Sequence, residues 1–458
     1  MEERLPLKVK LCYSAGSMGK VVQGLAASTF LLYFYTEVLG INSGIAASII
    51  FFCKLFDIIN DPLIGALVDR NKSKEGKCRA YLKYFAIPTG VCIFLCFFVP
   101  LKKTALQLAY IIITYGVLAT ISSFIQIPMN TLMGRMSQNE QQRSHLNQLS
   151  GIVSLVGNYV VVSWTFPIAN FFGNGDLRKG FLFVGLFYGV IYAAAYMVTY
   201  LGTKGYELVE DSQPAGGLAQ EAEVSLKETV KGLLANKIWL CIGLYYLFDM
   251  IATTLESTAM VFYFQYNLKD TGLLSTYSLV AMICNFLIFS SLHLFTKRLG
   301  NAGTTLLGCC LSISGDVLRL LLHDSSMGVL YAGWILSSLG SCLVAGTVLL
   351  NLFDAKVYGE WKHGIKCDAV LMSGFTLATK IGMAVGSAAV GWFLLLVPYT
   401  EGAQTQPQPV LDLFFLLNTA LPACSFFLVL LLAIPVYKNE KKLPEMKEEL
   451  EERKHESI

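Results

Sequence analysis

Charged residues are scarce in this chain. Asp, Glu, Lys and Arg make up 15% of its 458 residues, whereas 54% are hydrophobic. A soluble domain carries about 25% charged residues, so this composition excludes a soluble globular protein and indicates a chain that crosses a membrane many times. The net charge is only +3, and the basic residues are scattered over the polar connections. We therefore expect no nucleic-acid partner, because such a partner requires a basic patch.

The chain also lacks the residue groupings of enzymes and of structural metal sites. Its 12 cysteines form no C-x-x-C pair and no Cys/His cluster, and most of them lie within apolar runs. They are expected to be small buried hydrophobic residues, neither disulfides nor metal ligands. The five histidines are dispersed, no nucleophile motif occurs, and the polar segments are too short for a signalling domain. We expect a protein that is not an enzyme and has no organic cofactor.

Apolar windows long enough to cross a membrane as helices dominate the sequence. Twelve windows of roughly 20 residues or more are present. They lie near residues 11–37, 43–68, 81–100, 106–134, 147–172, 179–201, 238–266, 273–296, 302–322, 326–353, 370–398 and 409–437. An even number of spans places both termini on one side. Lys and Arg are concentrated in short loops on that side, above all in residues 70–79, which makes it the cytoplasmic side. We expect a multi-pass protein of the plasma membrane with both termini in the cytoplasm.

One long polar interruption divides the spans six and six. The expected organisation is an N-terminal six-helix bundle over 1–201, a cytoplasmic middle loop over 202–237, a C-terminal six-helix bundle over 238–437 and a charged cytoplasmic tail over 438–458 that holds no site. Within the middle loop, Ser225-Leu-Lys-Glu228 has a capping-box pattern, which predicts a short amphipathic helix. Two six-span halves are typical of secondary carriers, which bind solute near the membrane midplane. The predicted fold class is an all-α integral membrane protein of twelve transmembrane helices in two bundles, expected to be a monomer.

Polar residues interrupt the second apolar window. Asp57 and Asp61 are four residues apart and share one helical face, with Lys54 and Asn60 close to that face. Pro62 has no N–H, so it frees a backbone carbonyl of the preceding turn. Carboxylates, an amide oxygen and a spare carbonyl suit a small hard cation, and ionisable residues inside a membrane span indicate function. The alternative is a structural ion pair between Lys54 and Asp57.

The motifs of this chain resemble those of a known transporter family. Gly65-Ala-Leu-Val-Asp69-Arg70 resembles the signature of the major facilitator superfamily, whose acid and arginine clamp the cytoplasmic ends of helices. Asp57-Ile-Ile-Asn60-Asp61-Pro62, Gln126-Ile-Pro128 and Tyr358-Gly-Glu360-Trp361-Lys362-His-Gly364 are similar to the glycoside–pentoside–hexuronide:cation symporters, the melibiose-carrier family. The likeness covers nearly the whole chain. It implies the major facilitator fold and transport by alternating access.

The resemblance implies a complete site for Na⁺, or for Li⁺ or H⁺, as the coupling ion. Its oxygen ligands would be Asp57, Asn60, Asp61 and Ser123 of the fourth span. Lys380 matches a family lysine near that site, where it would compete for the acids when the cation leaves; the alternative is that it extends toward an interface. Lys54 falls where the family often has an arginine, so Lys54 and Lys380 are the candidate coupling residues.

The solute side departs from the family pattern. The melibiose-type carriers have acids where this chain has Val21 and Gln126, a tryptophan at the position of Asn130 and an arginine at that of Gly151. Carboxylates accept strong hydrogen bonds from sugar hydroxyls, whereas Val21 accepts none and Gln126 only neutral ones. The candidate solute contacts in the first half are Lys20, Tyr33, Gln126 and Asn130.

The second half supplies further charged candidates. Asp249 and Glu256 are seven residues apart, so they share a helical face, and solute contact and structural pairing remain equally open for them. Asp316 and Arg319, three apart, are expected to pair with each other. A cytoplasmic gate is expected from the following residues: Asp69, Arg70, Asp354, Tyr358, Glu360, Trp361 and Lys362.

Two functions therefore stand at this point. One is Na⁺-coupled (or Li⁺- or H⁺-coupled) symport of a sugar, glycoside or sugar acid, with a glycoside, pentoside or uronate and the lipid bilayer as partners. The alternative is a major facilitator carrier for a non-sugar organic anion or amphiphile. The missing sugar-binding acids and an aromatic content of 12% are the reasons for considering that alternative, and symport of a sugar stays the first hypothesis.

Overall fold

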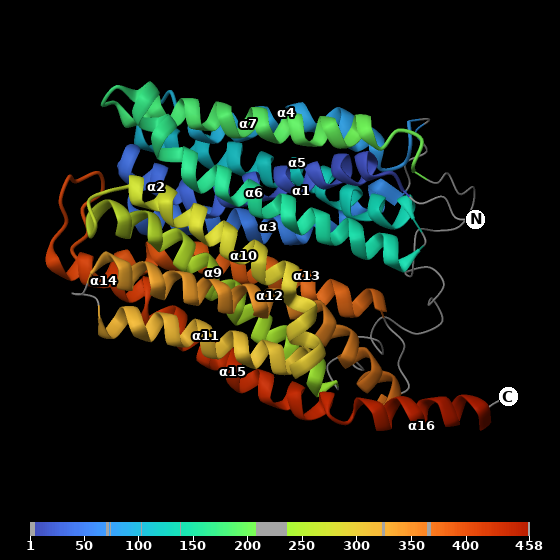
Figure 1. Ribbon diagram of the computed structural model, residues 1–458. Coiled ribbons are helices and arrows are strands. Elements are labelled where there is room, and N and C mark those ends of the chain that lie inside the picture. Colours follow the sequence, from blue (N-terminus) through green and yellow to red (C-terminus); the bar gives the residue numbers. More distant parts are fainter. Residues whose placement is uncertain are drawn as a thin grey trace. The chain divides into compact units, whose positions relative to one another are not determined.

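A computed structural model describes residues 5–69, 73, 75–101, 103–137, 139–207, 236–322, 326–363 and 368–456. Helices account for the regular structure of these residues, and no strand occurs among them (Figure 1). Eleven of the described helices are long and apolar enough to cross a membrane. The first expected span forms a twelfth helical run, which is divided by two π-helical turns. The predicted all-helical membrane fold is confirmed.

The helical elements follow the predicted windows closely. Their bounds are α1 Leu7–Leu25, η1 Ala26–Phe30, α2 Leu31–Tyr33, η2 Phe34–Val38, α3 Ser43–Asp69, α4 Arg79–Phe97, α5 Thr104–Met136, α6 Glu140–Gly173, α7 Leu177–Gly202, α9 Lys237–Tyr266, α10 Gly272–Leu299, α11 Asn301–Leu321, α12 Met327–His363, α13 Asp368–Leu394, α14 Gln408–Asn418, α15 Ala420–Glu440 and α16 Leu443–Glu456. Most of the middle loop, including the expected amphipathic helix, lies outside the described residues.

The chain forms two compact units whose boundaries fall inside helices. Unit 1 is Met1–Gln213 with Ser257–Met282 and Ser387–Phe414, and unit 2 is Pro214–Glu256 with Ile283–Gly386 and Phe415–Ile458. Four helices, α9, α10, α13 and α14, therefore begin in one unit and end in the other. The domain boundaries expected from the spans stay a prediction.

Small residues bring helices into backbone contact within each unit. In unit 1, α4 and α7 run side by side, and a Cβ atom on Gly90 would lie 2.5 Å from the carbonyl oxygen of Gly189 (Figure 1). In unit 2, α11 and α12 approach in the same way, because a Cβ atom on Gly308 would lie 2.7 Å from the carbonyl oxygen of Gly340. Such close approach is typical of helices that pack in a membrane, where van der Waals contact replaces the hydrophobic effect.

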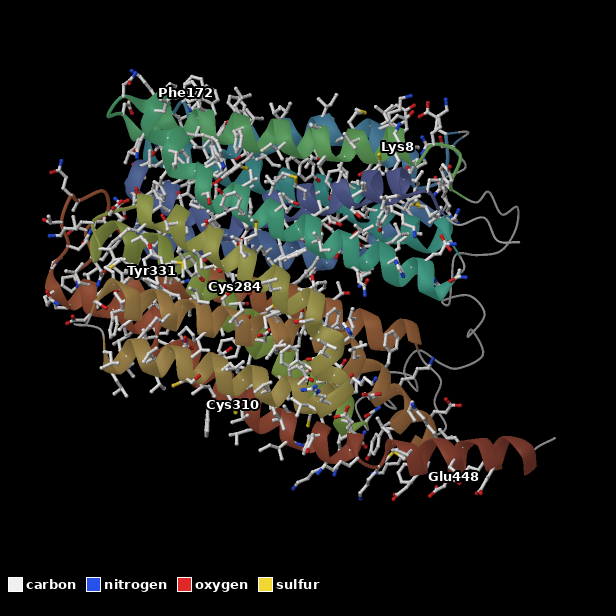
Figure 2. The ribbon with its side chains drawn as sticks, in the orientation of Figure 1. Lys8, Phe172, Cys284, Cys310, Tyr331 and Glu448 are labelled. Carbon is white, nitrogen blue, oxygen red and sulfur yellow. The ribbon has the colours of Figure 1, made fainter. Side chains whose placement is uncertain are left out.

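Large apolar side chains remain exposed along the helices. Phe52, Leu63 and Phe172 are among them, and Figure 2 shows Phe172 at the surface. In water such side chains would be costly to expose, whereas in a bilayer they face lipid. The surface of the helices is therefore consistent with the spans that the sequence predicts.

Candidate functional site

Two acids of α3 and one hydroxyl of α5 meet inside unit 1. The Oγ atom of Ser123 lies 2.7 Å from Oδ1 of Asp57 and 2.8 Å from Oδ1 of Asp61. The two carboxylates face the same hydroxyl because they are one helical turn apart. Both acids are half-buried, whereas Ser123 is buried. Three of the four expected cation ligands, Asp57, Asp61 and Ser123, thus lie together between α3 and α5.

The fourth expected ligand, Asn60, lies on the same stretch of α3. Its Nδ2 atom donates to Oγ1 of Thr120, 3.3 Å away, and this threonine is nearly one turn before Ser123 on α5. The amide nitrogen is therefore engaged with α5, and the amide oxygen is the atom that a cation could use. Sequence reasoning missed Thr120, although its spacing of three residues from Ser123 places it on the same face of a helix.

The two candidate coupling lysines lie in different units. Nζ of Lys54 donates to Oγ of Ser387, 3.1 Å away in the unit 1 part of α13, and Lys54 also interacts electrostatically with Asp57. Lys54 thus stands beside the acids, as its spacing suggests. Lys380 lies on the unit 2 part of α13 and is half-buried. Its role near the acids stays a prediction.

Amides of α1 and α5 form a polar stripe next to the acids. Nε2 of Gln126 donates to Oε1 of Gln23, 2.8 Å away. Asn130 follows Gln126 by one turn and is exposed, and Lys20 precedes Gln23 by nearly one turn and is exposed as well. The polar stripe therefore consists of Lys20 and Gln23 on α1 and of Gln126 and Asn130 on α5, and three of these four residues are candidate solute contacts. Sequence reasoning missed Gln23, because its partner lies on another helix.

Tyr33, the remaining solute candidate of the first half, lies in different surroundings. Its side chain is 0% exposed, and its ring packs edge-on against Phe166 with centroids 5.4 Å apart. Its hydroxyl donates to Oε1 of Gln265. Phe181 and Phe262 contact the same ring. Tyr33 therefore belongs to an aromatic cluster, and its hydroxyl is engaged with Gln265 of α9.

Unit 1 also contains a buried acid that sequence reasoning missed. Glu37 lies at the end of the first helical run, and the hydroxyls of Tyr266 and Tyr399 both donate to its carboxylate. The hydroxyl of Tyr266 also lies 3.0 Å from the carbonyl oxygen of Ala403. These residues join the ends of α9 and α13 to the end of the first run, within unit 1. In the sequence, Glu37 is marked only by its position at the end of the first apolar window.

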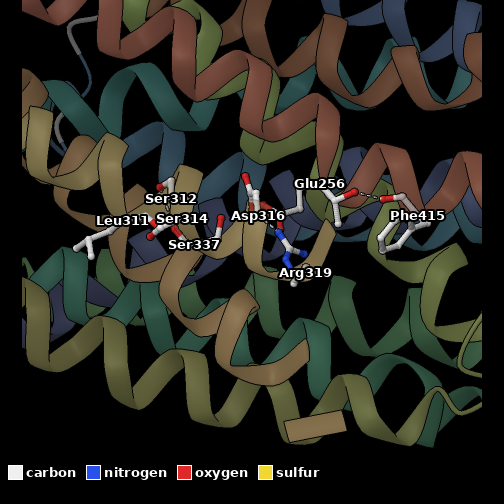
Figure 3. A network of polar contacts seen from close by, with 9 residues as sticks. Glu256, Leu311, Ser312, Ser314, Asp316, Arg319, Ser337 and Phe415 are labelled. Atoms are coloured by element: carbon white, nitrogen blue, oxygen red, sulfur yellow. Dashed lines mark hydrogen bonds and ion pairs between the residues drawn. The ribbon is translucent and has the colours of Figure 1, made fainter. Parts of the chain in front are cut away.

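The charged candidates of the second half lie in unit 2. Asp249 is 0% exposed, and neither of its carboxylate oxygens has a hydrogen-bond partner among the described residues. Glu256 accepts a hydrogen bond from Nη2 of Arg319, 2.9 Å away, and the same nitrogen contacts Oδ1 of Asp316 (Figure 3). The expected pair of Asp316 and Arg319 is confirmed. For Glu256 the structure favours pairing, which was one of its two open interpretations.

The expected gate residues of α12 are held by polar contacts at the end of that helix. Oδ2 of Asp354 accepts from Nδ2 of Asn301, 2.9 Å away, and Nζ of Lys362 lies 2.8 Å from the hydroxyl of Tyr358. Glu360 lies one residue before Trp361 on the same helix. The side chain of Asp69 and all of Arg70 lie outside the described residues.

The charged tail contacts this part of α12. Nε1 of Trp361 donates to Oε2 of Glu449 in α16, 2.6 Å away, and Nη1 of Arg453 donates to the carbonyl oxygen of Trp361, 3.0 Å away. Leu443 and Met446 are buried at the start of α16. Of the two states that the alternating charges of the tail allow, a solvated helix or disorder, the structure shows a helix, and its first turn packs in the protein.

In unit 1, the carboxylate of Glu207 binds backbone N–H groups at the start of α4. Oε1 of Glu207 accepts from the backbone N–H of Cys78, 2.8 Å away, and its Oε2 accepts from that of Arg79. Burial, together with the nearby Glu207 carboxylate, raises the pKa of the Cys78 thiol to about 12. The thiol is therefore neutral and unreactive at physiological pH.

Comparison with known proteins identifies the family to which this architecture belongs. Residues 12–438 match the family described as MFS/sugar transport protein, so the chain belongs to this family of the major facilitator superfamily. The predicted resemblance to its glycoside–cation symporters is confirmed. Members of this family are transporters and not enzymes, as expected.

Several curated relatives are similar along their whole length. The isoprimeverose transporter of Lactiplantibacillus pentosus is 26% identical over 98% of this chain and 92% of its own. The glucuronide carrier protein homolog of Escherichia coli is 26% identical over 99% and 97%. A putative 2,3-dihydroxypropane-1-sulfonate exporter of Salmonella typhimurium is 23% identical over 99% and 97%.

Solved structures show the same fold. A D-xylose-proton symporter has a TM-score of 0.67 at 13% identity and covers 95% of this chain and 98% of its own. A bacterial homologue of ferroportin in an inward-facing state has a TM-score of 0.62 at 13% identity. The twelve-helix major facilitator fold is thus shown, and the protein is a multi-pass membrane transporter whose homologues carry small sugar-like solutes.

Proposed function

We propose that the protein is a secondary active symporter of the plasma membrane, with both termini in the cytoplasm, which couples Na⁺ to the movement of a sugar, glycoside or sugar acid. Li⁺ or H⁺ could replace Na⁺ at the same site. The observation that carries this proposal is the meeting of Asp57, Asp61 and Ser123 in unit 1. Alternating access is the expected mechanism of this fold.

Because the two carboxylates lie close together, a positive charge bound between them would be stabilised. One hydroxyl proton can bond to only one carboxylate at a time, so the Ser123 hydroxyl cannot satisfy Asp57 and Asp61 together. Two unit negative charges about 5 Å apart repel by about 3 kcal/mol at an effective dielectric constant of 20. A cation held among the three oxygens removes this repulsion. The oxygen ligands and single positive charge suit Na⁺.

Lys54 supplies the competing positive charge when the cation is absent. It interacts with Asp57 and donates to Ser387, so it is already placed next to the acids. An ion that binds at the acids would weaken the attraction between Lys54 and Asp57. Solute and cation would then favour each other's binding by the same factor, because linkage between two sites is reciprocal.

The polar stripe indicates how the solute would be held. Amide side chains of Gln23, Gln126 and Asn130 can both donate to and accept from sugar hydroxyls, and the exposed ammonium group of Lys20 attracts a carboxylate or sulfonate. The relatives named for a glucuronide and for a dihydroxypropane sulfonate support an acidic solute. A sugar acid therefore fits these residues better than a neutral α-galactoside.

A second candidate function rests on the same stripe. Without a carboxylate at Val21 or Gln126, the stripe has no strong acceptor for hydroxyl groups, and Lys20 alone would suffice for a non-sugar organic anion. A carrier of this kind would accept a simple aliphatic sulfonate or carboxylate as well as the sugar acids. Stabilisation by both solute types against heat would favour it.

The test is uptake into vesicles that contain the reconstituted full chain. Isoprimeverose, a methyl glucuronide and 2,3-dihydroxypropane-1-sulfonate would be offered as labelled solutes, each with an inward gradient of Na⁺, Li⁺ or H⁺ and without a gradient. We expect at least one solute to accumulate only with a cation gradient. Asp61→Asn should abolish that accumulation, whereas Asp412→Asn, at an exposed residue of α14, should leave it intact. Equal uptake with and without every gradient would overturn the proposal.

A further inference from the structure

A second group of ionised side chains lies in unit 2, apart from the cation site. Glu256 of α9 and Asp316 and Arg319 of α11 turn toward one another, as Figure 3 shows. Both carboxylates contact the same guanidinium nitrogen, Nη2 of Arg319. We call these three residues the acid–arginine triad.

The charges of the acid–arginine triad do not balance. If both carboxylates are ionised, the two negative charges exceed the single positive charge of the guanidinium, and the net charge of the triad is −1. The side chains of Asp316 and Arg319 are 0% and 1% exposed, and that of Glu256 is 15% exposed. An unbalanced charge in such surroundings is very costly, so one acid must be neutralised. Among the described residues, no lysine, histidine or second arginine forms an ion pair with these acids.

The geometry around Asp316 provides a place for a proton. Its Oδ2 atom is buried and lacks a hydrogen bond among the described residues, and the hydroxyl of Ser337 on α12 faces the same carboxyl group and is itself unsatisfied. A proton on Oδ2 would turn this atom into a donor for the Ser337 oxygen. On the other side, the indole of Trp334 lies against Arg319, with the guanidinium carbon 5.5 Å from the ring centroid.

We propose that the acid–arginine triad is a proton-binding site of the transporter, separate from the cation site on α3. The triad holds one proton while Glu256 and Asp316 both contact Arg319. When Glu256 leaves Arg319, Asp316 and Arg319 form a balanced pair and the proton passes to water. Glu256 is the last residue of α9 that belongs to unit 2, so it stands where this helix passes from one unit into the other.

The other titratable groups near the triad do not change the charge balance. Asp249 lies two turns before Glu256 on α9, and Tyr331 stacks edge-on against Trp334 on α12, with ring centroids 6.0 Å apart. Asp249 is another buried acid, so it could only add negative charge, and a phenol is neutral at physiological pH. The proton is therefore assigned to the two acids that share Arg319, which titrate as one unit.

Infrared spectroscopy of the purified full-length protein tests this assignment. A protonated carboxyl group gives a C=O stretching band that ionised carboxylates lack and that shifts on exchange into D₂O. We expect the wild type to show this band for the triad at neutral pH. Either Glu256→Gln or Asp316→Asn should remove one carboxylic acid from the spectrum, because each leaves one acid for one arginine.

The remaining variants separate the explanations. Arg319→Lys keeps the positive charge and should keep the band. This variant still tests the proposal if Glu256→Gln or Asp316→Asn fails to fold. Asp249→Asn should remove only the contribution of Asp249. Asp61→Asn should leave the triad's band unchanged, so a failure of the Na⁺ proposal and a failure of this one give different results. A band lost in Asp316→Asn but kept in Glu256→Gln, or kept in both, would overturn the shared proton.

Discussion

The hydroxyl of Ser123 gives the sharpest prediction about the proposed cation site. Ser123→Ala removes one proposed oxygen ligand, the hydroxyl that lies within hydrogen-bond distance of both Asp57 and Asp61. The methyl group of alanine fits the space that serine occupied, so the packing of α5 against α3 should persist. The change therefore isolates the contribution of the hydroxyl.

The expected magnitude follows from the charges involved. A hydrogen bond to a charged group contributes about 1.5–3 kcal/mol. Because 1.4 kcal/mol corresponds to a tenfold change in an equilibrium constant, loss of the hydroxyl should weaken Na⁺ binding by about 10- to 150-fold. The loss should be larger for Na⁺ than for H⁺, since a proton shared by two carboxylates needs no further oxygen ligand.

The neighbouring residue provides a matched control. Ser122 is also buried on α5, but its hydroxyl donates to the carbonyl oxygen of Ala119, 2.8 Å away in the same helix. Ser122→Ala should therefore leave Na⁺ affinity within about twofold of the wild type, since it removes only a local bond in a helix. Both variants change a buried serine to alanine, and they differ only in the face of α5 that is altered.

The assay is equilibrium binding of radioactive Na⁺ to purified protein, without any solute. This choice keeps the result independent of the unknown solute. Unchanged affinity in Ser123→Ala would refute the reasoning, and so would an equal loss in Ser122→Ala, because the effect would then come from the helix as a whole. Thermal unfolding of each variant checks that it is folded.

Two further predictions concern the solute stripe and helix packing. Gln23→Ala leaves Nε2 of Gln126 without its acceptor, so KM for the transported solute should rise about fivefold while the maximal rate stays the same, as measured in vesicle uptake. Gly308→Val should lower the free energy of unfolding by about 1–3 kcal/mol, measured by thermal unfolding, because the valine side chain would collide with the backbone at Gly340. The control is Gly243→Val, at a glycine with open space around it, which should have a smaller effect. Equal losses in the two variants would contradict this account.

Features that depend on one helix could be predicted from the sequence. Hydropathy located the spans, and the spacing of Asp57 and Asp61 placed both acids on one face, because the geometry of a helix fixes such neighbours. The spacing of Asp316 and Arg319 predicted their pair in the same way. No solved neighbour was needed for these conclusions.

Features that depend on two helices were harder to predict. Gln23 bonds to Gln126 and Glu256 bonds to Arg319 only because separate helices pack at a particular register, which hydropathy does not encode. The family resemblance supplied Ser123, since its motif carries the packing of α3 against α5. Tyr33 was a candidate solute contact, but aromatic neighbours from other helices enclose it, which the sequence did not reveal.

The connectivity of α13 suggests how the proposed cation site in unit 1 can influence unit 2. Ser387, which bonds to Lys54, is the first residue of α13 in unit 1, and Gly386 before it is the last in unit 2. Lys380 lies nearly two turns earlier on the same helix. A cation at Asp57 that releases Lys54 would also loosen its bond to Ser387. Since a helix transmits displacement along its axis, α13 is the element through which we expect cation binding to reach the second half of the transporter.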